Sequence, residues 1–192
     1  MTANFDVMET DVMVGFGGKQ AWLAVRDSDP EAILAALDLR DLGTVRWRDG
    51  IDLAHLTDDR VAVTPPLGGW TLAVGRYLMR PPDVAELSAK LQTEVQFFAT
   101  HRVTESHRWQ RAADGLLIRA FGYVGQTGSV TTWFGDPDPA ERDAGLPASY
   151  DDETTVLVAE QDVLKVAGTW SIDPTTLGGR PAPGPIRIGA SD

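Results

Sequence analysis

The chain has 192 residues, 43% of them apolar, and its 17 basic and 28 acidic side chains give a net charge of −11. Such a chain is long enough to form one packed domain, and its lack of cysteine excludes disulfides, a thiol nucleophile and thiolate zinc sites. The acidic surplus disfavours binding to DNA or RNA, whose phosphates repel it.

The first residues are acidic and lack the basic and apolar regions of a signal peptide. No apolar run approaches the roughly 20 residues that cross a bilayer. We therefore expect a soluble, cytoplasmic protein with no membrane partner. Gly15-Phe-Gly-Gly-Lys19 lacks the spacing of a phosphate loop, and we expect no cofactor.

The first half of the chain alternates strand and helix signals. The apolar run 21–25 predicts a buried strand, and Asp29, Pro30 and Glu31 are typical of the start of the next helix. A proline- and glycine-rich loop predicts an antiparallel pair from the strands on its two sides. The further elements expected here are strands at 46–50, 60–64 and 70–75 and a helix at 81–91.

The second half predicts a meander. Asp114-Gly115 is a two-residue hairpin signal. A cap, a proline and a closing glycine indicate a short helix within 136–145, and a further helix at 160–167 is expected to stop at Gly168. The expected strands are 95–100, 105–112, 116–124 and 129–134.

These elements predict an α+β fold with a mostly antiparallel sheet. The expected order is β-α-β-β-β-α, a four-strand meander and a last helix, with the helices on one face. We expect a flexible amino-terminal arm over residues 1–19, a single domain over 20–177 and a flexible tail rich in proline and glycine over 178–192.

Several segments resemble an uncharacterised bacterial family of about this length. Val63-Thr-Pro-Pro-Leu-Gly-Gly-Trp-Thr-Leu-Ala-Val-Gly75 is similar to its VTPP…GWTLVVG segment, and 95–109 to its THRV…H.W segment. Residues 119–125 and 166–175 are similar to two further segments of that family. The resemblance covers about residues 20–177 and implies one intact domain, but it brings no activity.

The densest group of reactive side chains lies in His101-Arg-Val-Thr-Glu-Ser-His-Arg-Trp109. In one continuous strand, His101, Glu105 and His107 would share a face, with the two histidines about 20 Å apart. Glu105 and His107 would be neighbours at about 6.6 Å, close enough to share a proton. Arg102 could stabilise negative charge, and the alternative is that all four residues are structural.

A bend near Glu105 would change this geometry. His101, Glu105 and His107 could then converge as two histidines and one carboxylate, a set that binds metals. The spacing matches no strong metal motif, and we expect no metal site. Trp109, Tyr123 and Trp133 could instead line a cleft for a small apolar ligand.

Two functions fit these features. The first is a non-enzymatic interaction protein, such as an immunity or inhibitor module, that binds another protein through an acidic surface. The alternative is a small-molecule enzyme, a cyclase, isomerase or hydrolase, that works by general acid–base catalysis without cysteine or nucleotide cofactor. In that enzyme His107 and Glu105 would move protons while Arg102 or His101 stabilises charge.

Overall fold

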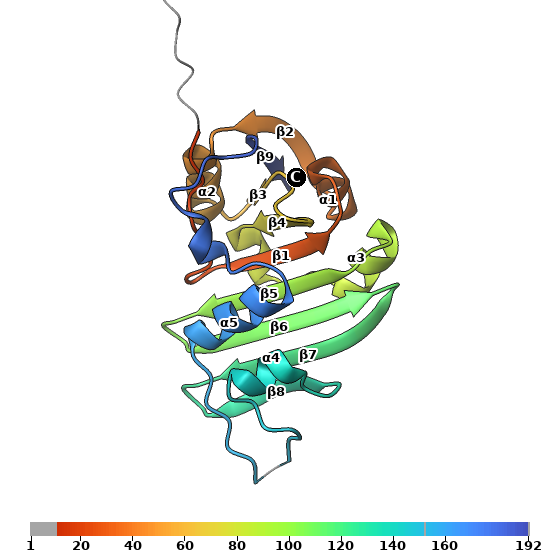
Figure 1. Cartoon of the computed structure of the whole chain (residues 1–192), viewed down its shortest axis with the longest axis vertical. Coiled ribbons are helices and arrows are strands. Elements are labelled where there is room, and N and C mark those ends of the chain that lie inside the picture. The colour runs from red at the N-terminus through yellow and green to blue at the C-terminus, as the bar shows by residue number, and fades with distance from the viewer. Residues whose placement is uncertain (1–10, 152, 192) are drawn as a thin grey trace, which may run out of the picture.

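A computed structural model describes residues 11–151 and 153–191. All named strands in this part of the chain form one antiparallel sheet in the order β2-β9-β3-β4-β1-β5-β6-β7-β8 (Figure 1). The predicted α+β fold and meander are confirmed. The strands are β1 (Ala21–Arg26), β2 (Arg40–Val45), β3 (Arg60–Val63), β4 (Trp70–Val74), β5 (Val95–His101), β6 (Ser106–Ala113), β7 (Leu116–Val124), β8 (Ser129–Phe134) and β9 (Ile186–Ala190).

Helices pack on both faces of this sheet. Those in the described residues are α1 (Pro30–Ala36), α2 (Trp47–Leu56), α3 (Val84–Leu91), α4 (Pro139–Asp143), α5 (Glu160–Trp170) and the 3-10 helices η1 (Arg76–Met79) and η2 (Pro174–Leu177). We call the side covered by α2, α4 and α5 the α5 face, and the side covered by α1, η1 and α3 the α3 face. Figure 1 shows α4 and α5 lying across β5 to β8.

The expectation that helices lie on one face is therefore wrong, and β1 shows the reason. Trp22 and Ala24 pack in the core of the α5 face, whereas Leu23 and Val25 pack in the core of the α3 face. A strand without polar alternation is buried on both sides. The continuous apolar run of β1 thus requires cover on each face.

Residues 47–50 are helical, which corrects the strand predicted at 46–50. Arg46 is the extended residue before α2, and Trp47 begins the helix. The backbone N–H of Trp47 donates to the Asp11 carboxylate at 2.8 Å, which caps this end of the helix from a distant part of the chain. The preceding residues, rather than 46–50, form the strand β2. At the other end of the chain, α5 continues past Gly168 to Trp170.

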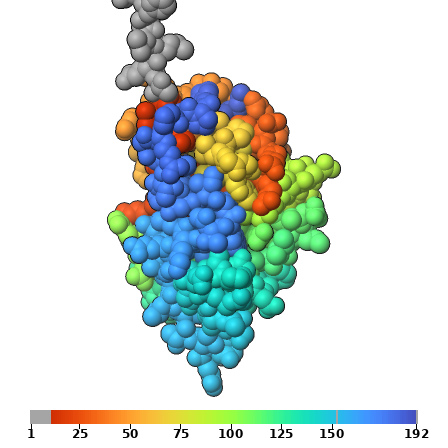
Figure 2. Space-filling model, in the orientation of Figure 1, coloured from red at the N-terminus to blue at the C-terminus, as the bar shows by residue number. Residues whose placement is uncertain are grey.

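The predicted flexible tail contains β9, an inner strand between β2 and β3. Its prolines end at residue 185, and the buried Ile186 and Ile188 follow them into the core. The part of the predicted arm that is described is also ordered, because Met13 N–H donates to the Arg180 carbonyl at 2.8 Å and Phe16 is buried. Figure 2 shows this contact of the first and last segments in red and blue. Residues 1–10 of the predicted arm lie outside the described residues.

Within the described residues, every helix is too short or too polar to span a bilayer.

Candidate functional site

The segment that the sequence singles out is a hairpin. β5 ends at His101, residues 102–105 turn, and β6 begins at Ser106. Glu105 occupies the left-handed region at φ 48°, and its carbonyl accepts the Gly125 backbone N–H at 2.9 Å. The chain therefore reverses direction near Glu105, and the continuous-strand geometry is wrong.

This reversal separates the two histidines. Thr100 pairs with His107 across the strands, and His101 pairs with Ser106. Cross-strand partners share a face, so Thr100 and His107 lie on the α5 face and His101 lies on the α3 face. The His101 ring is 3.0 Å from the Thr104 hydroxyl in its own turn. His101 therefore does not join His107, and the facial metal arrangement does not form.

A hollow of about 680 Å³ opens where the hairpin meets the start of α5. Arg102, Glu105, His107 and Tyr123 line it from the strands. Residues 157–162 line the other side, with the carboxylates of Glu160 and Asp162 among them. Three of the four predicted reactive residues thus meet in one concavity.

His107 is the buried centre of this hollow, with 2% of its surface exposed. Its ring stacks on Tyr123 with an angle of 12° between the planes. Burial lowers the pKa of His107 below its ordinary value of 6.5, while the nearby carboxylates of Glu160, Glu105 and Asp162 act in the opposite direction. The imidazole is therefore neutral at pH 7.

Its neighbours determine which ring nitrogen carries the proton. The Thr100 hydroxyl lies 3.0 Å from His107 Nδ1 and donates to Glu160 Oε2 at 3.3 Å. Lys19 N–H donates to the same carboxylate oxygen at 3.1 Å. With the single hydroxyl proton of Thr100 donated to Glu160, we assign the His107 ring proton to Nδ1, which donates to Thr100. Nε2 is then the unprotonated acceptor nitrogen.

Nε2 of His107 faces the hollow. No described residue makes a hydrogen bond to this nitrogen. It is nevertheless not one of the fully buried polar atoms that lack a partner in this part of the chain. Nε2 therefore reaches solvent, and the hollow is the concavity that His107 lines. The site offers an imidazole lone pair and three carboxylates, all of which accept hydrogen bonds, beside the single guanidinium of Arg102.

The predicted aromatic cleft does not form as a unit. Trp109 is fully buried, stacks on Phe121 and donates Nε1–H to Glu141 at 2.6 Å. Trp133 lies 4.5 Å from the Arg119 guanidinium, away from the lining of the hollow. Of the three predicted aromatics, Tyr123 alone lines the site, because Trp109 and Trp133 serve the packing under α4 instead.

The sequence did not indicate Thr100 or Glu160 as site residues, nor the buried ion pair of Arg119 and Glu141. Arg119 Nε donates to Glu141 Oε1 at 2.8 Å, and both side chains are buried. The sequence feature that indicates this ion pair is an arginine inside the apolar strand β7, because a buried charge requires a partner. The sequence predicts Glu160 as the first residue of a helix, but its contact with Thr100 depends on how that helix packs on the sheet.

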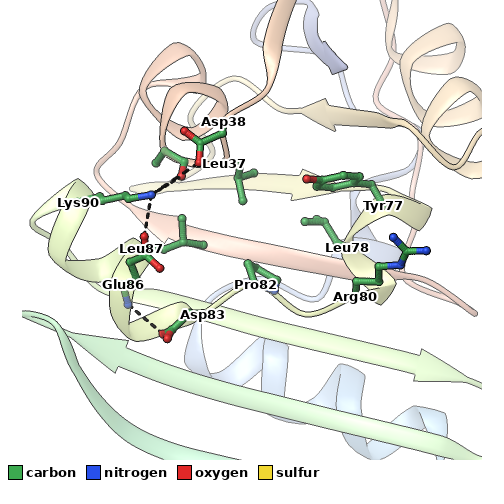
Figure 3. A pocket seen from close by; sticks show the side chains of 11 residues that line it. Leu37, Asp38, Tyr77, Leu78, Arg80, Pro82, Asp83, Glu86, Leu87 and Lys90 are labelled. Carbon is green, nitrogen blue, oxygen red and sulfur yellow. Dashed lines mark hydrogen bonds and ion pairs between the residues drawn. The ribbon is translucent and has the colours of Figure 1, made fainter. Parts of the chain in front are cut away.

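A second hollow, of about 260 Å³, lies between α1, η1 and α3 (Figure 3). Its floor is apolar and includes Leu37 and Leu78. On its rim, Lys90 Nζ is 2.9 Å from Glu86 and 3.9 Å from Asp38. These charges satisfy one another, so this smaller hollow offers less to a ligand than the site at His107.

In the described residues, no three histidine, aspartate or glutamate side chains form a group that could hold a metal ion. No family model matches the chain, and neither a curated protein nor a solved structure is similar to it.

Proposed function

We propose that the chain is a non-enzymatic interaction protein that receives a cationic side chain of another protein in the hollow at His107. The observation that supports this proposal is the acceptor nitrogen of a buried, neutral imidazole among three carboxylates. A lysine or arginine side chain supplies positive charge and hydrogen-bond donors to these acceptors, which outnumber the one guanidinium of the site, that of Arg102.

The charge of the whole chain favours the same partner. A net charge of −11 attracts a basic protein surface over a distance and disfavours nucleic acid. Leu157, at the rim of the hollow, is largely exposed and offers an apolar contact beside the carboxylates. In the cytoplasm, the chain would act as an immunity or inhibitor module that binds a partner with a basic site.

The test uses N-acetyl-arginine amide as the probe and N-acetyl-glutamine amide as its neutral match. We expect the arginine probe to shift the NMR signals of the His107 ring with a Kd on the order of 1–10 mM, and the glutamine probe to have no effect. Glu105→Gln, at an exposed position, should weaken arginine binding about threefold or more. Glu86→Gln, in the hollow of Figure 3, is the matched control and should bind as the unmodified chain does. Equal shifts with both probes would refute the proposal.

General acid–base catalysis at the same site is the second candidate. The chain of contacts Glu160–Thr100–His107 supports it, because it leaves Nε2 free to take a proton. Glu105 would be the second proton-transfer group, and Arg102 would stabilise developing negative charge. His101 has no role in this version.

Hydrolysis of p-nitrophenyl acetate tests this second candidate. The rate should fall as the pH is lowered and the His107 imidazole becomes protonated, with a midpoint on the acid side of an ordinary histidine because burial lowers the pKa of His107. His107→Gln should abolish the rate. His101→Gln is the control and should leave the rate unchanged. A rate that His107→Gln does not lower would exclude this candidate but not the binding function.

A further inference from the structure

Arg108 is a partly buried cation that lacks a counter-charge. All lysines and arginines of the chain lie in the described residues, and five of them are at least partly buried. Four of the five form an ion pair with a carboxylate: Arg60, Arg111, Arg119 and Arg187. Arg108 is the fifth, and its side chain makes neither an ion pair nor a hydrogen bond with any described residue. A charge that is partly removed from water needs a partner, so Arg108 is a candidate to bind an anion from solution.

Arg108 lines a hollow of about 240 Å³ on the α3 face, between η1 and the hairpin of β5 and β6. Arg108 pairs with Ala99 across the strands, and Ser106 pairs with His101. Cross-strand partners share a face, and Ala99 belongs to the buried core of the α3 face. The alternation of the two strands therefore puts Arg108, His101 and Ser106 on the face opposite to His107.

The polar side chains of this hollow supply hydrogen-bond donors. The backbone N–H of Thr104 donates to His101 Nδ1 at 3.4 Å, so we assign the ring proton of His101 to Nε2, which makes no hydrogen bond to a described residue. The Ser106 hydroxyl is also free of described partners, and no acidic residue lines the hollow. Arg108, His101 and Ser106 thus offer donors and a positive charge, which is the reverse of the acceptor-rich hollow at His107.

The rest of the lining is apolar. Phe97 is fully buried and Ala99 is 7% exposed, whereas Met79 of η1 lines the hollow with 38% of its surface exposed. The polarizable thioether of methionine makes favourable contacts with aromatic rings. A ligand with an apolar body would cover the exposed surface of Met79, and a bare inorganic anion would not.

We propose that this hollow binds a small aromatic carboxylate, with the carboxylate on Arg108 and the ring against Met79. The parallel N–H groups of a guanidinium match the two oxygens of a carboxylate, and His101 and Ser106 add donors beside it. The volume of about 240 Å³ lies below the roughly 300–1,000 Å³ of pockets for drug-sized ligands, so the occupant is a molecule of a single ring.

The net charge of the chain limits the affinity. A charge of −11 repels an anion at long range, while Arg108 attracts it only at contact. We therefore expect a Kd on the order of 1–10 mM for a molecule as small as benzoate.

Sodium benzoate is the probe, benzamide is its neutral match, and inorganic phosphate is an anion without an apolar body. At constant ionic strength, benzoate should shift the NMR signals of the Arg108 Nε–H and of the His101 ring, and it should leave the His107 ring unchanged. Benzamide should have no effect, because it carries no charge. Phosphate should bind about threefold more weakly or less, because it leaves Met79 uncovered.

Arg108→Gln should weaken benzoate binding about tenfold or more, since it removes the charge that pairs with the carboxylate. Arg48→Gln, at an exposed position of α2, removes the same charge elsewhere and should bind benzoate as the unmodified chain does.

Urea unfolding separates this binding role from a structural one. Because Arg108 has no counter-charge in the described chain, Arg108→Gln should keep or raise the urea midpoint. Arg111→Gln is the matched comparison and should lower it, because it removes the partner that lies 2.7 Å from Glu94.

Three results would overturn the proposal: no benzoate binding, benzamide or phosphate binding as tight as that of benzoate, or an Arg108→Gln variant that binds benzoate unchanged. A urea midpoint that Arg108→Gln lowers as much as Arg111→Gln does would also overturn it, because Arg108 would then have a structural role. The arginine probe of the proposed function acts at His107 on the other face, so either binding can fail without the other.

Discussion

Arg119 and Glu141 form a buried ion pair whose two members also hold several neighbours in place. Arg119 Nη1 donates to the carbonyls of Phe134 and Gly135, and Glu141 accepts Trp109 Nε1–H. A buried charge without its partner is costly, because the interior cannot solvate it. The pair therefore fixes α4 against β6 and β7.

Glu141→Gln tests this pair. The amide can still accept the Trp109 N–H, but Arg119 loses its counter-charge, and we expect a loss of about 3–5 kcal/mol in the free energy of unfolding in urea. The double variant Arg119→Met/Glu141→Gln leaves no uncompensated charge and should lose less than the single variant. A single variant that costs under about 1 kcal/mol would contradict the role of the pair.

His107 links folding to pH. Since burial lowers its pKa in the folded chain, the unfolded chain binds a proton there at higher pH than the folded chain does. The stability from a neutral His107 is fully present above pH 6.5 and is lost as the pH falls below that value. The urea midpoint should therefore decrease more between pH 7.5 and pH 5.5 in the unmodified chain than in His107→Gln. Parallel falls in the two proteins would contradict this assignment, because His55 and His101 are common to both.

At the scale of elements, β9 is held between helices on both faces of the sheet. On one side, a Cβ added to Gly50 of α2 would lie 2.9 Å from Ile186 Cβ. On the other, a Cβ added to Gly189 would lie 3.2 Å from Leu39 Cβ and would clash with Leu34. Both glycines allow a close approach that any side chain would prevent.

Gly50→Ala separates this packing from helix propensity. Alanine normally stabilises a helix interior by about 0.5–1 kcal/mol relative to glycine. Here the clash with the β-branched Ile186 should cost about 1–3 kcal/mol, so we expect a net loss in urea unfolding. Gly168→Ala in α5, where the nearest atom is 3.3 Å away, is the control and should change stability by under about 1 kcal/mol. A more stable Gly50→Ala chain would show that α2 and β9 are not tightly packed.

The sequence predicted elements well where the signal is local and failed where partners are distant. The Asp114-Gly115 hairpin and the cap and proline of α4 are local, and both form. β9 was missed because three prolines and several glycines suggested a tail, while its partners β2 and β3 lie far back in the chain. In the site, Glu105 and His107 were found from proximity in sequence, but Glu160 was not, because only the packing of α5 brings it there.

At the scale of the whole molecule, the excess of acid acts against the compact state. Eleven uncompensated charges repel one another more strongly when folded than when the chain is expanded. Raising sodium chloride from about 20 to 200 mM at pH 7.5 should therefore raise the thermal midpoint, since the Debye length shortens. Near the sequence pI of about 4.6 the net charge vanishes, and the same salt increase should have little effect. An equal salt response at the two pH values would contradict this origin.

The place of β9 in the sheet also affects how the chain folds as it is synthesised. Domains generally begin to fold from their amino-terminal part while the ribosome is still adding residues. Among the described strands, β2 pairs only with β9, and β9 follows every other described element in the sequence. During translation β2 has no neighbour, and the outer side of β3 stays unpaired, even when the strands from β4 to β8 are complete. Until residues 186–190 emerge, the backbone of β2 and the outer side of β3 lack the strand that completes the sheet.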